Sequence, residues 1–252
     1  MSLTRKIDYL NFDSLYSVDA LNDCFDSTFV LMHKYTNIKK IYLKNCEIPI
    51  GFPNIRSSNF SNVLSFILNG ITYNPSITQQ NYSTISSLIT ALNTSILTAI
   101  GGSGFTFTLS VSLGNNIIIT TTGGFTSYSI NQNTLSNILG LSSALNQIAG
   151  TYTSPYIFNL GYDTYIQMSF NNIPSIFSTL GNVPSAVKIP MNTNAYNILF
   201  YSTDRDNYDQ GLTIADSSFI LNSMRIIMYD RFGYPLNNGN LEYSFTLGVE
   251  YE

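Results

Sequence analysis

Three aspartates in one short segment are the residues best suited to binding a metal ion. Asp204, Asp206 and Asp209 lie in the sequence TDRDNYDQG, 203–211, and carboxylate oxygens are ligands that Ca²⁺ prefers. The spacing matches a calcium loop only in part, because no glutamate follows where a bidentate ligand is needed. A solvated loop between strands explains the same residues, so both interpretations stay open and no metal site is assigned.

His33 is the single histidine of the chain, which limits the catalytic chemistry available. One imidazole can serve a Ser-His-Asp set, but no GxSxG motif is present to hold a nucleophilic serine. The glycine-rich segment GGSG, 101–104, lacks the lysine of a phosphate-binding loop and precedes a predicted strand rather than a helix. Spacing marks out no carboxylate pair for glycoside hydrolysis. We therefore predict a protein that is not an enzyme, with no catalytic residue and no cofactor.

Charged residues are scarce, and this scarcity bears on the partners of the protein. They make up 10% of the 252 residues, against about 25% in an average globular domain. The one basic cluster, formed by Lys34, Lys39, Lys40 and Lys44, is too short for the stripe that nucleic-acid binding requires. Much of the surface is expected to face other protein, although an AT-rich genome would also enrich Asn and Ile.

The cysteines and the apolar runs bear on the compartment. Cys24 and Cys46 are the only cysteines, and two thiols without a CxxC motif favour assembly in a reducing compartment. The first residues, MSLTRKIDYLNF, contain no apolar run of the kind found in signal peptides. No stretch approaches the roughly 18 apolar residues of a membrane span, so none is expected.

Period-two alternation of apolar and polar residues is the main structural signal. In 241–252 the apolar side chains share one face, and Glu242, Glu250 and Glu252 lie on the other, on the surface or against a neighbouring subunit. A strand at 223–230 precedes it, and the turn pair Asn238-Gly239 predicts that these two strands pair antiparallel. Segments 105–113, 117–122 and 125–130 predict a meander. Further strands are expected at 39–47, 63–73, 163–170, 185–190 and 195–202.

Two helices are predicted between the strands. The first covers 84–98, with Ser83 or Thr84 as its N-cap and an apolar stripe that must pack on a sheet. The second covers 134–139, with Thr134 as a possible cap and Gly140 as its stop. Many short strands and few helices are typical of an all-β sandwich or barrel. Because no linker is evident, one domain is expected.

The order of these features resembles that of the penton and minor capsid proteins of large eukaryotic DNA viruses, virophages and polinton-like viruses. Four stretches carry the resemblance: 38–55 with its EIP motif, 71–96, 105–143, and 223–252 with the turn Asp230-Arg231-Phe232-Gly233. The resemblance implies a single jelly-roll β-sandwich over 26–252, with the two helices inserted between strands. Region 140–160 does not align with the pattern.

The resemblance also implies a function in assembly. It predicts a structural capsid protein, a penton that closes icosahedral fivefold vertices as a homopentamer. The implied partners are further copies, a double-jelly-roll major capsid protein and other minor capsid proteins, with no direct nucleic-acid contact, and the implied location is the capsid vertex of the virion. Residues 1–25 are expected to form an arm that reaches neighbouring capsomers and orders on assembly. Its acidic residues are Asp8, Asp13, Asp19 and Asp23, and Asp26 follows directly after it.

Two alternatives fit the same fold class, because jelly rolls host unrelated functions. One is a receptor- or carbohydrate-binding β-sandwich, such as a fibre or lectin-like domain. Tyrosines in its loops would stack on sugars, and the candidates are Tyr152, Tyr156, Tyr162, Tyr201 and Tyr208. The other alternative is a hydrolase built on a jelly roll.

Overall fold

The structure is a computed structural model of the chain. It describes residues 5–18, 25–101, 104–123, 127–142, 150–161, 163–170, 176–177, 184–185, 187–193, 197–202, 212–213 and 219–252. The chain divides into two compact units: unit 1 is Met1–Phe52 with Asp163–Glu252, and unit 2 is Pro53–Tyr162. Unit 2 is therefore inserted into unit 1, where the sequence predicts one domain over 26–252.

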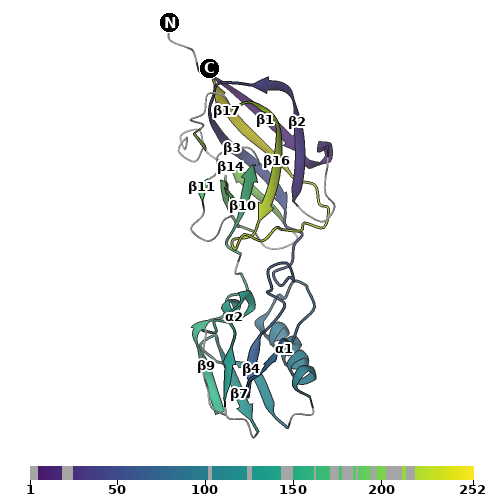
Figure 1. The fold of residues 1–252 in the computed structure, drawn as a ribbon, viewed down its shortest axis with the longest axis vertical. Helices are drawn as coiled ribbons and strands as arrows, with labels where there is room; N and C mark the ends of the chain where they lie inside the picture. Colours follow the sequence, from purple (N-terminus) through teal and green to yellow (C-terminus); the bar gives the residue numbers. More distant parts are fainter. Residues whose placement is uncertain are drawn as a thin grey trace. The chain divides into compact units, whose positions relative to one another are not determined.

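Unit 1 is a sandwich of two antiparallel sheets (Figure 1). The first sheet has the order β1-β17-β3-β14, with β15 also paired to β3, and the second has the order β13-β10-β16-β2. A separate pair joins β11 to β12. The strands are β1 (Lys6–Asp13), β2 (Asp26–Tyr35), β3 (Ile38–Pro49), β10 (Tyr165–Phe170), β11 (Ile176–Phe177), β12 (Pro184–Ser185), β13 (Val187–Pro190), β14 (Ile198–Ser202), β15 (Leu212–Thr213), β16 (Leu221–Tyr229) and β17 (Ser244–Tyr251).

The path of the chain through unit 1 has the character of a jelly roll. β1 lies in the first sheet, β2 in the second and β3 in the first again, and β14, β16 and β17 repeat this alternation. A double-sheet jelly roll is built from such crossings between two sheets. The structure thus confirms the predicted all-β sandwich, with few helices.

The core of unit 1 is formed by side chains from the inner faces of both sheets. Phe12 and Phe245, from the first sheet, stack with ring centroids 4.7 Å apart. Phe29, from the second sheet, meets them edge to face at 5.1 and 5.8 Å. Such aromatic pairs favour offset-stacked or edge-to-face contact. These three rings therefore tie the two sheets together.

The predicted pairing of the last two strands is wrong. β16 and β17 lie in different sheets. Asp230 Oδ1 accepts hydrogen bonds from the N–H groups of Phe232 and Tyr234, both at 2.9 Å. This turn sends the chain back along β16, where the Leu236 N–H donates to the Met228 carbonyl at 3.0 Å. Only after this return does the chain cross to the first sheet.

The loop after that return is fastened to the first sheet by Asn238. Its side-chain oxygen accepts from the Gly51 N–H at 3.1 Å, and its amide nitrogen donates to the Leu241 carbonyl at 2.7 Å. Gly239 has a positive φ of 64°, so the Asn238-Gly239 pair does turn the chain, as predicted. It turns the chain between sheets rather than within a hairpin. The alternation in β17 is confirmed, since Phe245, Leu247 and Val249 are buried.

Unit 2 combines two small sheets with two helices, α1 (Ile85–Ile100) and α2 (Thr134–Ile138). One sheet has the order β5-β4-β8 and the other β6-β7-β9. Its strands are β4 (Phe66–Leu68), β5 (Ile71–Tyr73), β6 (Thr106–Val111), β7 (Asn116–Thr122), β8 (Tyr128–Ile130) and β9 (Gly150–Ile157). Helices and sheets share one apolar core that is separate from the core of unit 1.

The helix predictions are confirmed with one change of cap. α1 begins after Thr84, whose hydroxyl oxygen accepts from the Ser87 N–H at 3.2 Å. α2 is capped by Asn133 rather than by Thr134, because the Asn133 side chain accepts from the Ser136 N–H at 2.9 Å. Gly140 follows α2 with a φ of +69°. Among the described residues, neither helix is long and apolar enough to cross a membrane.

Two strand predictions in unit 2 need correction. The predicted strand 63–73 is a hairpin of β4 and β5, turned by Asn69 and Gly70, which both have positive φ. The predicted third strand of the meander corresponds to β8, which pairs with β4 instead. The strand that pairs with β7 on that side is β9. Tyr128 of β8 packs edge to face on Phe107 of β6 at 5.4 Å, so core packing rather than hairpin succession positions β8.

Candidate interaction surface

Several residues singled out from the sequence lie outside the described residues. They are Asp19, Asp23, Cys24, Tyr162, Asp204, Asp206, Tyr208 and Asp209, together with positions 102 and 103 of the glycine-rich segment. Within the described part of the chain, no group of His, Cys, Asp or Glu is arranged to hold a metal ion. The metal hypothesis for 203–211 therefore stays a prediction. His33 lies on β2 and is exposed.

The range predicted to form an arm contains a strand of the sandwich. Lys6–Asp13 forms β1, which pairs with β17 from Lys6↔Tyr251 to Asp13↔Ser244. Phe12 lies in the core, and Asp13 accepts a hydrogen bond from the Leu15 N–H at 2.9 Å. Ordering of 1–25 on assembly stays a prediction. In the structure, however, β1 is already part of the first sheet.

β1 and β2 are the edge strands of their respective sheets, on the same side of the sandwich. Among the described strands, β1 pairs only with β17 and β2 only with β16. The Tyr35 hydroxyl of β2 donates to Asp8 Oδ2 of β1 at 3.2 Å. Edge strands expose unpaired backbone groups that can bind another chain. We call this side of unit 1 the β1–β2 edge.

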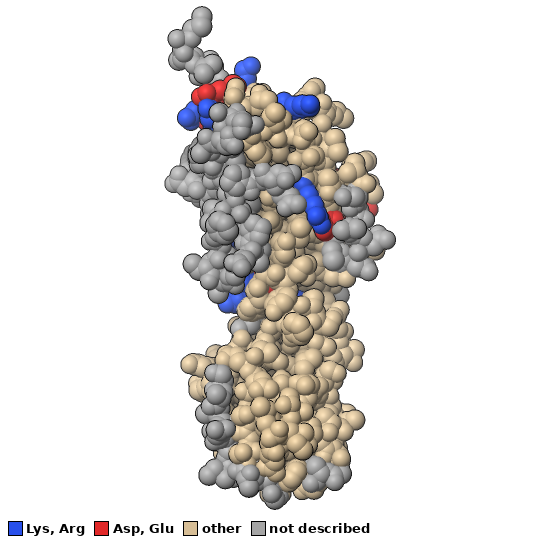
Figure 2. All heavy atoms as spheres, in the orientation of Figure 1, with Lys and Arg blue, Asp and Glu red and all other residues tan. Residues whose placement is uncertain are grey.

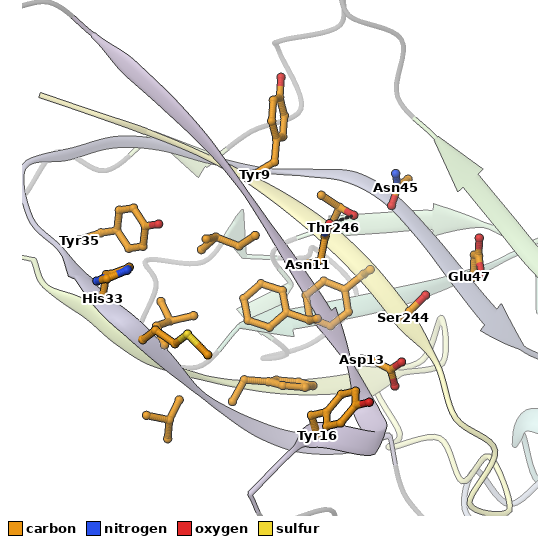
Figure 3. A pocket seen from close by; sticks show the side chains of 17 residues that line it. Tyr9, Asn11, Asp13, Tyr16, His33, Tyr35, Asn45, Glu47, Ser244 and Thr246 are labelled. Carbon is orange, nitrogen blue, oxygen red and sulfur yellow. Dashed lines mark hydrogen bonds between the residues drawn. The ribbon is translucent and has the colours of Figure 1, made fainter.

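The β1–β2 edge carries a groove with a volume of about 810 Å³. Met32, Val30, Tyr9 and Tyr16 line it, with 98%, 64%, 53% and 77% of their surfaces exposed. In Figure 3, Tyr9 and Asn45 lie on one side of β1, and Tyr16 and His33, which belongs to β2, lie on the other. Grouped exposed apolar side chains on a soluble domain indicate a contact site for another macromolecule.

A break in the pairing of β2 exposes these side chains. β2 pairs with β16 at Tyr35↔Leu221 and at Val30↔Ser223, with a register shift between them. Between Val30 and Tyr35, β2 has more residues than the facing part of β16 has, so β2 forms a bulge there. Phe29 and Tyr35 stay buried while Val30 and Met32 face solvent. The alternation expected for a strand is therefore interrupted, which explains why sequence reasoning missed β2.

Asp8 holds β1 in place across three strands. Its Oδ2 accepts hydrogen bonds from the hydroxyl groups of Tyr35 on β2 at 3.2 Å and of Tyr251 on β17 at 3.0 Å. The hydrogen bond to Asp8 raises the pKa of Tyr251, and burial together with the same carboxylate raises the pKa of Tyr35. The cluster therefore fixes the position of the β1–β2 edge while both phenols remain protonated.

The glutamates on the acidic face of β17 are either paired with a basic residue or exposed. Glu250 forms an ion pair with Arg5 at 2.8 Å, and Glu252 forms one with Lys39 at 3.1 Å. Glu242 is exposed. Their place on the surface agrees with the prediction, whereas contact with a neighbouring subunit stays a prediction. At the base of the β1–β2 edge, Arg225 of β16 binds both carboxylate oxygens of Asp26 at 2.7 and 2.6 Å.

Most of the side chains that line the groove are aromatic or aliphatic. Within the described part of the chain, His33 makes no hydrogen bond to an aspartate, glutamate or serine side chain, so no nucleophile–base pair is formed there. Its walls are mostly aromatic and aliphatic, with Asn, Ser and Thr between them and with Asp13, His33 and Glu47 also in the lining. Such a surface suits a protein partner that supplies apolar side chains.

We expect the free energy of unfolding of unit 1 to fall as pH rises above 9. Burial raises the pKa of the Cys46 thiol from 9.0 to about 12 and that of the Tyr243 phenol from 10.0 to about 12. The unfolded chain loses these protons first, so their contribution is present below pH 9 and is lost toward pH 12. The thiol alone accounts for a decrease of at most roughly 4 kcal/mol.

Denaturant unfolding of a Cys24→Ser protein, measured from about pH 8 to about pH 11, checks this. Adding Cys46→Ala should make the decrease between about pH 9 and 10 smaller, because an unfolded cysteine ionises at a lower pH than an unfolded tyrosine. Equal pH dependence in the two proteins would contradict the assignment to Cys46.

The chain is similar to a known protein in fold, but not in sequence. No known protein-family profile matches the chain, and no curated protein sequence matches it. Among solved structures, the crystal structure of the mavirus penton protein is similar, with a TM-score of 0.52 and 12% sequence identity. The match covers 98% of this chain and 100% of that chain. At this identity the similarity shows a shared fold, and it spans both units.

Proposed function

We propose that the protein is a structural capsid protein, a penton that closes the fivefold vertices of an icosahedral capsid as a homopentamer. The observation that carries the proposal is the end-to-end match with the fold of the mavirus penton protein. Because fold alone does not determine function, the exposed β1–β2 edge is the second support. Assembly requires contact surfaces and no catalytic residue, so the proposal includes no enzymatic step.

The ring would form through two different surfaces of the sandwich. Rotational rings other than dimers need a heterologous interface, in which one patch meets a different patch of the next copy. At the end of the first sheet opposite to β1, the edge strand β14 exposes Ile198 and Phe200. We propose that the β1–β2 edge of one copy contacts the β14 side of its neighbour.

The same proposal gives the protein its location and partners. A penton lies at the capsid vertex of the virion and meets the double-jelly-roll major capsid protein and other minor capsid proteins. No direct nucleic-acid contact is included, since the few charges of the chain sum to −4 at pH 7 and nucleic-acid binding needs a basic surface.

Imaging of assembled particles tests this function. Icosahedrally averaged cryo-EM maps should hold five copies of the fold around every fivefold axis, with β1 and β2 in the contact between neighbours. Density for the protein only at other positions, such as a fibre projecting from the shell, would contradict the penton assignment and favour a receptor-binding role.

A further inference from the structure

Unit 2 has almost no electric charge. Arg56 is the single charged residue between Pro53 and Tyr162, and its side chain is buried. Every lysine, aspartate and glutamate of the chain therefore belongs to unit 1. On the face drawn in Figure 2, the blue and red atoms accordingly lie on unit 1 and none lies on unit 2.

Nucleotide composition does not explain this difference. An AT-rich genome enriches lysine along with Asn and Ile, because all three have AT-rich codons. Unit 2 is rich in Asn and Ile and yet lacks lysine altogether. A surface without charge gives up the usual source of solubility, so a function of that surface is the better explanation.

A groove of about 610 Å³ lies on unit 2 between helix α1 and the extended segment 74–80. Within that segment, Pro75 and Ile77 are buried, and the residues between and beside them point outward. The outward residues lining the groove are Asn74, Ser76, Thr78 and Gln80. None of these four side chains forms a hydrogen bond with any described residue. Their amide and hydroxyl groups are therefore available to a ligand.

The opposite wall is formed by one face of α1. Ser95 donates a hydrogen bond from its hydroxyl to the Ser76 carbonyl at 2.7 Å, which fixes the distance between helix and segment. Thr94 and Thr98 also line the groove, and each donates to the carbonyl one turn earlier at 3.0 Å. Their hydroxyl oxygens keep the capacity to accept a hydrogen bond. The groove thus has a fixed width and neutral polar groups on both walls.

We propose that this groove binds an uncharged, hydroxyl-rich ligand, a neutral oligosaccharide. Sugar hydroxyls both donate and accept, and they match the amides and hydroxyls that face each other here. The volume lies within the range of about 300 to 1,000 Å³ that is usual for small-molecule sites. Sulfated or sialylated glycans and nucleic acids gain no ion pair from these walls. The site goes beyond the assembly function and does not depend on the number of copies.

Binding of the full-length protein to an array of neutral and acidic oligosaccharides, followed by titration with the best neutral oligosaccharide, tests the proposal. We expect retention of at least one neutral oligosaccharide, with a dissociation constant unchanged within about twofold between low and high salt, because no ion pair is screened. Thr94→Arg, which fills the groove, should weaken binding about tenfold or more.

Ser86→Arg is the matched control. Ser86 is exposed on the same helix, two turns from Thr94, and does not line the groove. It should leave the dissociation constant unchanged. The proposal is wrong if only acidic glycans are retained, if none is retained, or if Thr94→Arg binds as well as the parent. The mass of each variant in solution reports separately on ring formation, because neither substitution lies in unit 1.

Discussion

Phe245→Ala is expected to destabilise unit 1 by roughly 3–5 kcal/mol and to leave unit 2 unaffected. Phe245 is 1% exposed and contacts Phe12 and Phe29, so its removal opens a cavity where the two sheets meet. The cores of the two units share no residue. Loss of packing in one core therefore does not directly reduce the stability of the other core.

Phe107→Ala provides the reciprocal change. Phe107 is buried in unit 2, where its ring stacks on Phe66 at 4.5 Å. Thermal unfolding followed by calorimetry should show two transitions, with Phe245→Ala lowering one and Phe107→Ala lowering the other. Phe200→Ala, at an exposed position of β14, should change neither transition by more than about 0.5 kcal/mol. A single transition that both core variants lower equally would contradict independent cores.

The double substitution Val30→Glu and Met32→Glu is expected to abolish assembly of the ring without unfolding the chain. Both side chains are exposed in the isolated subunit, so glutamates are tolerated there at little cost. In the proposed contact the same positions are buried against a neighbour, where an unpaired carboxylate costs several kcal/mol. Each 1.4 kcal/mol weakens association about tenfold, so the ring should dissociate.

Leu241→Glu is the control for that variant. Leu241 is an exposed leucine of unit 1 that does not line the groove of the β1–β2 edge. Its replacement should therefore leave the mass of the protein in solution unchanged. Light scattering and circular dichroism together separate assembly from folding. A double variant that keeps the parental mass would show that the β1–β2 edge is not the contact.

Strands with regular alternation were predictable from the sequence, but their partners were not. The buried face of β17 follows from Phe245, Leu247 and Val249, since a period of two places them together. Its pairing depends on residues distant in the chain, such as Phe245↔Cys46 and Phe12↔Phe245. The local turn at Asn238-Gly239 predicted that β17 pairs with β16. In the structure the segment around Leu236 bonds to β16 instead.

The interaction surface and the second unit were missed for different reasons. β2 has no regular alternation, because its bulge turns Val30 and Met32 outward. Unit 2, in contrast, left a clear signal in the composition: apart from Arg56, no charged residue lies between Glu47 and Asp163. Charge counted along the chain, rather than over its whole length, would have placed both boundaries to within a few residues.

The mass of the purified protein in solution tests the proposed function most directly. The subunit has a mass of 28.0 kDa, and a heterologous contact that closes around a fivefold axis gives a single assembled species of five copies. Native mass spectrometry or light scattering over a range of concentrations should therefore show a closed pentamer in equilibrium with monomer. A stable trimer, or a monomer at every concentration, would contradict the penton assignment.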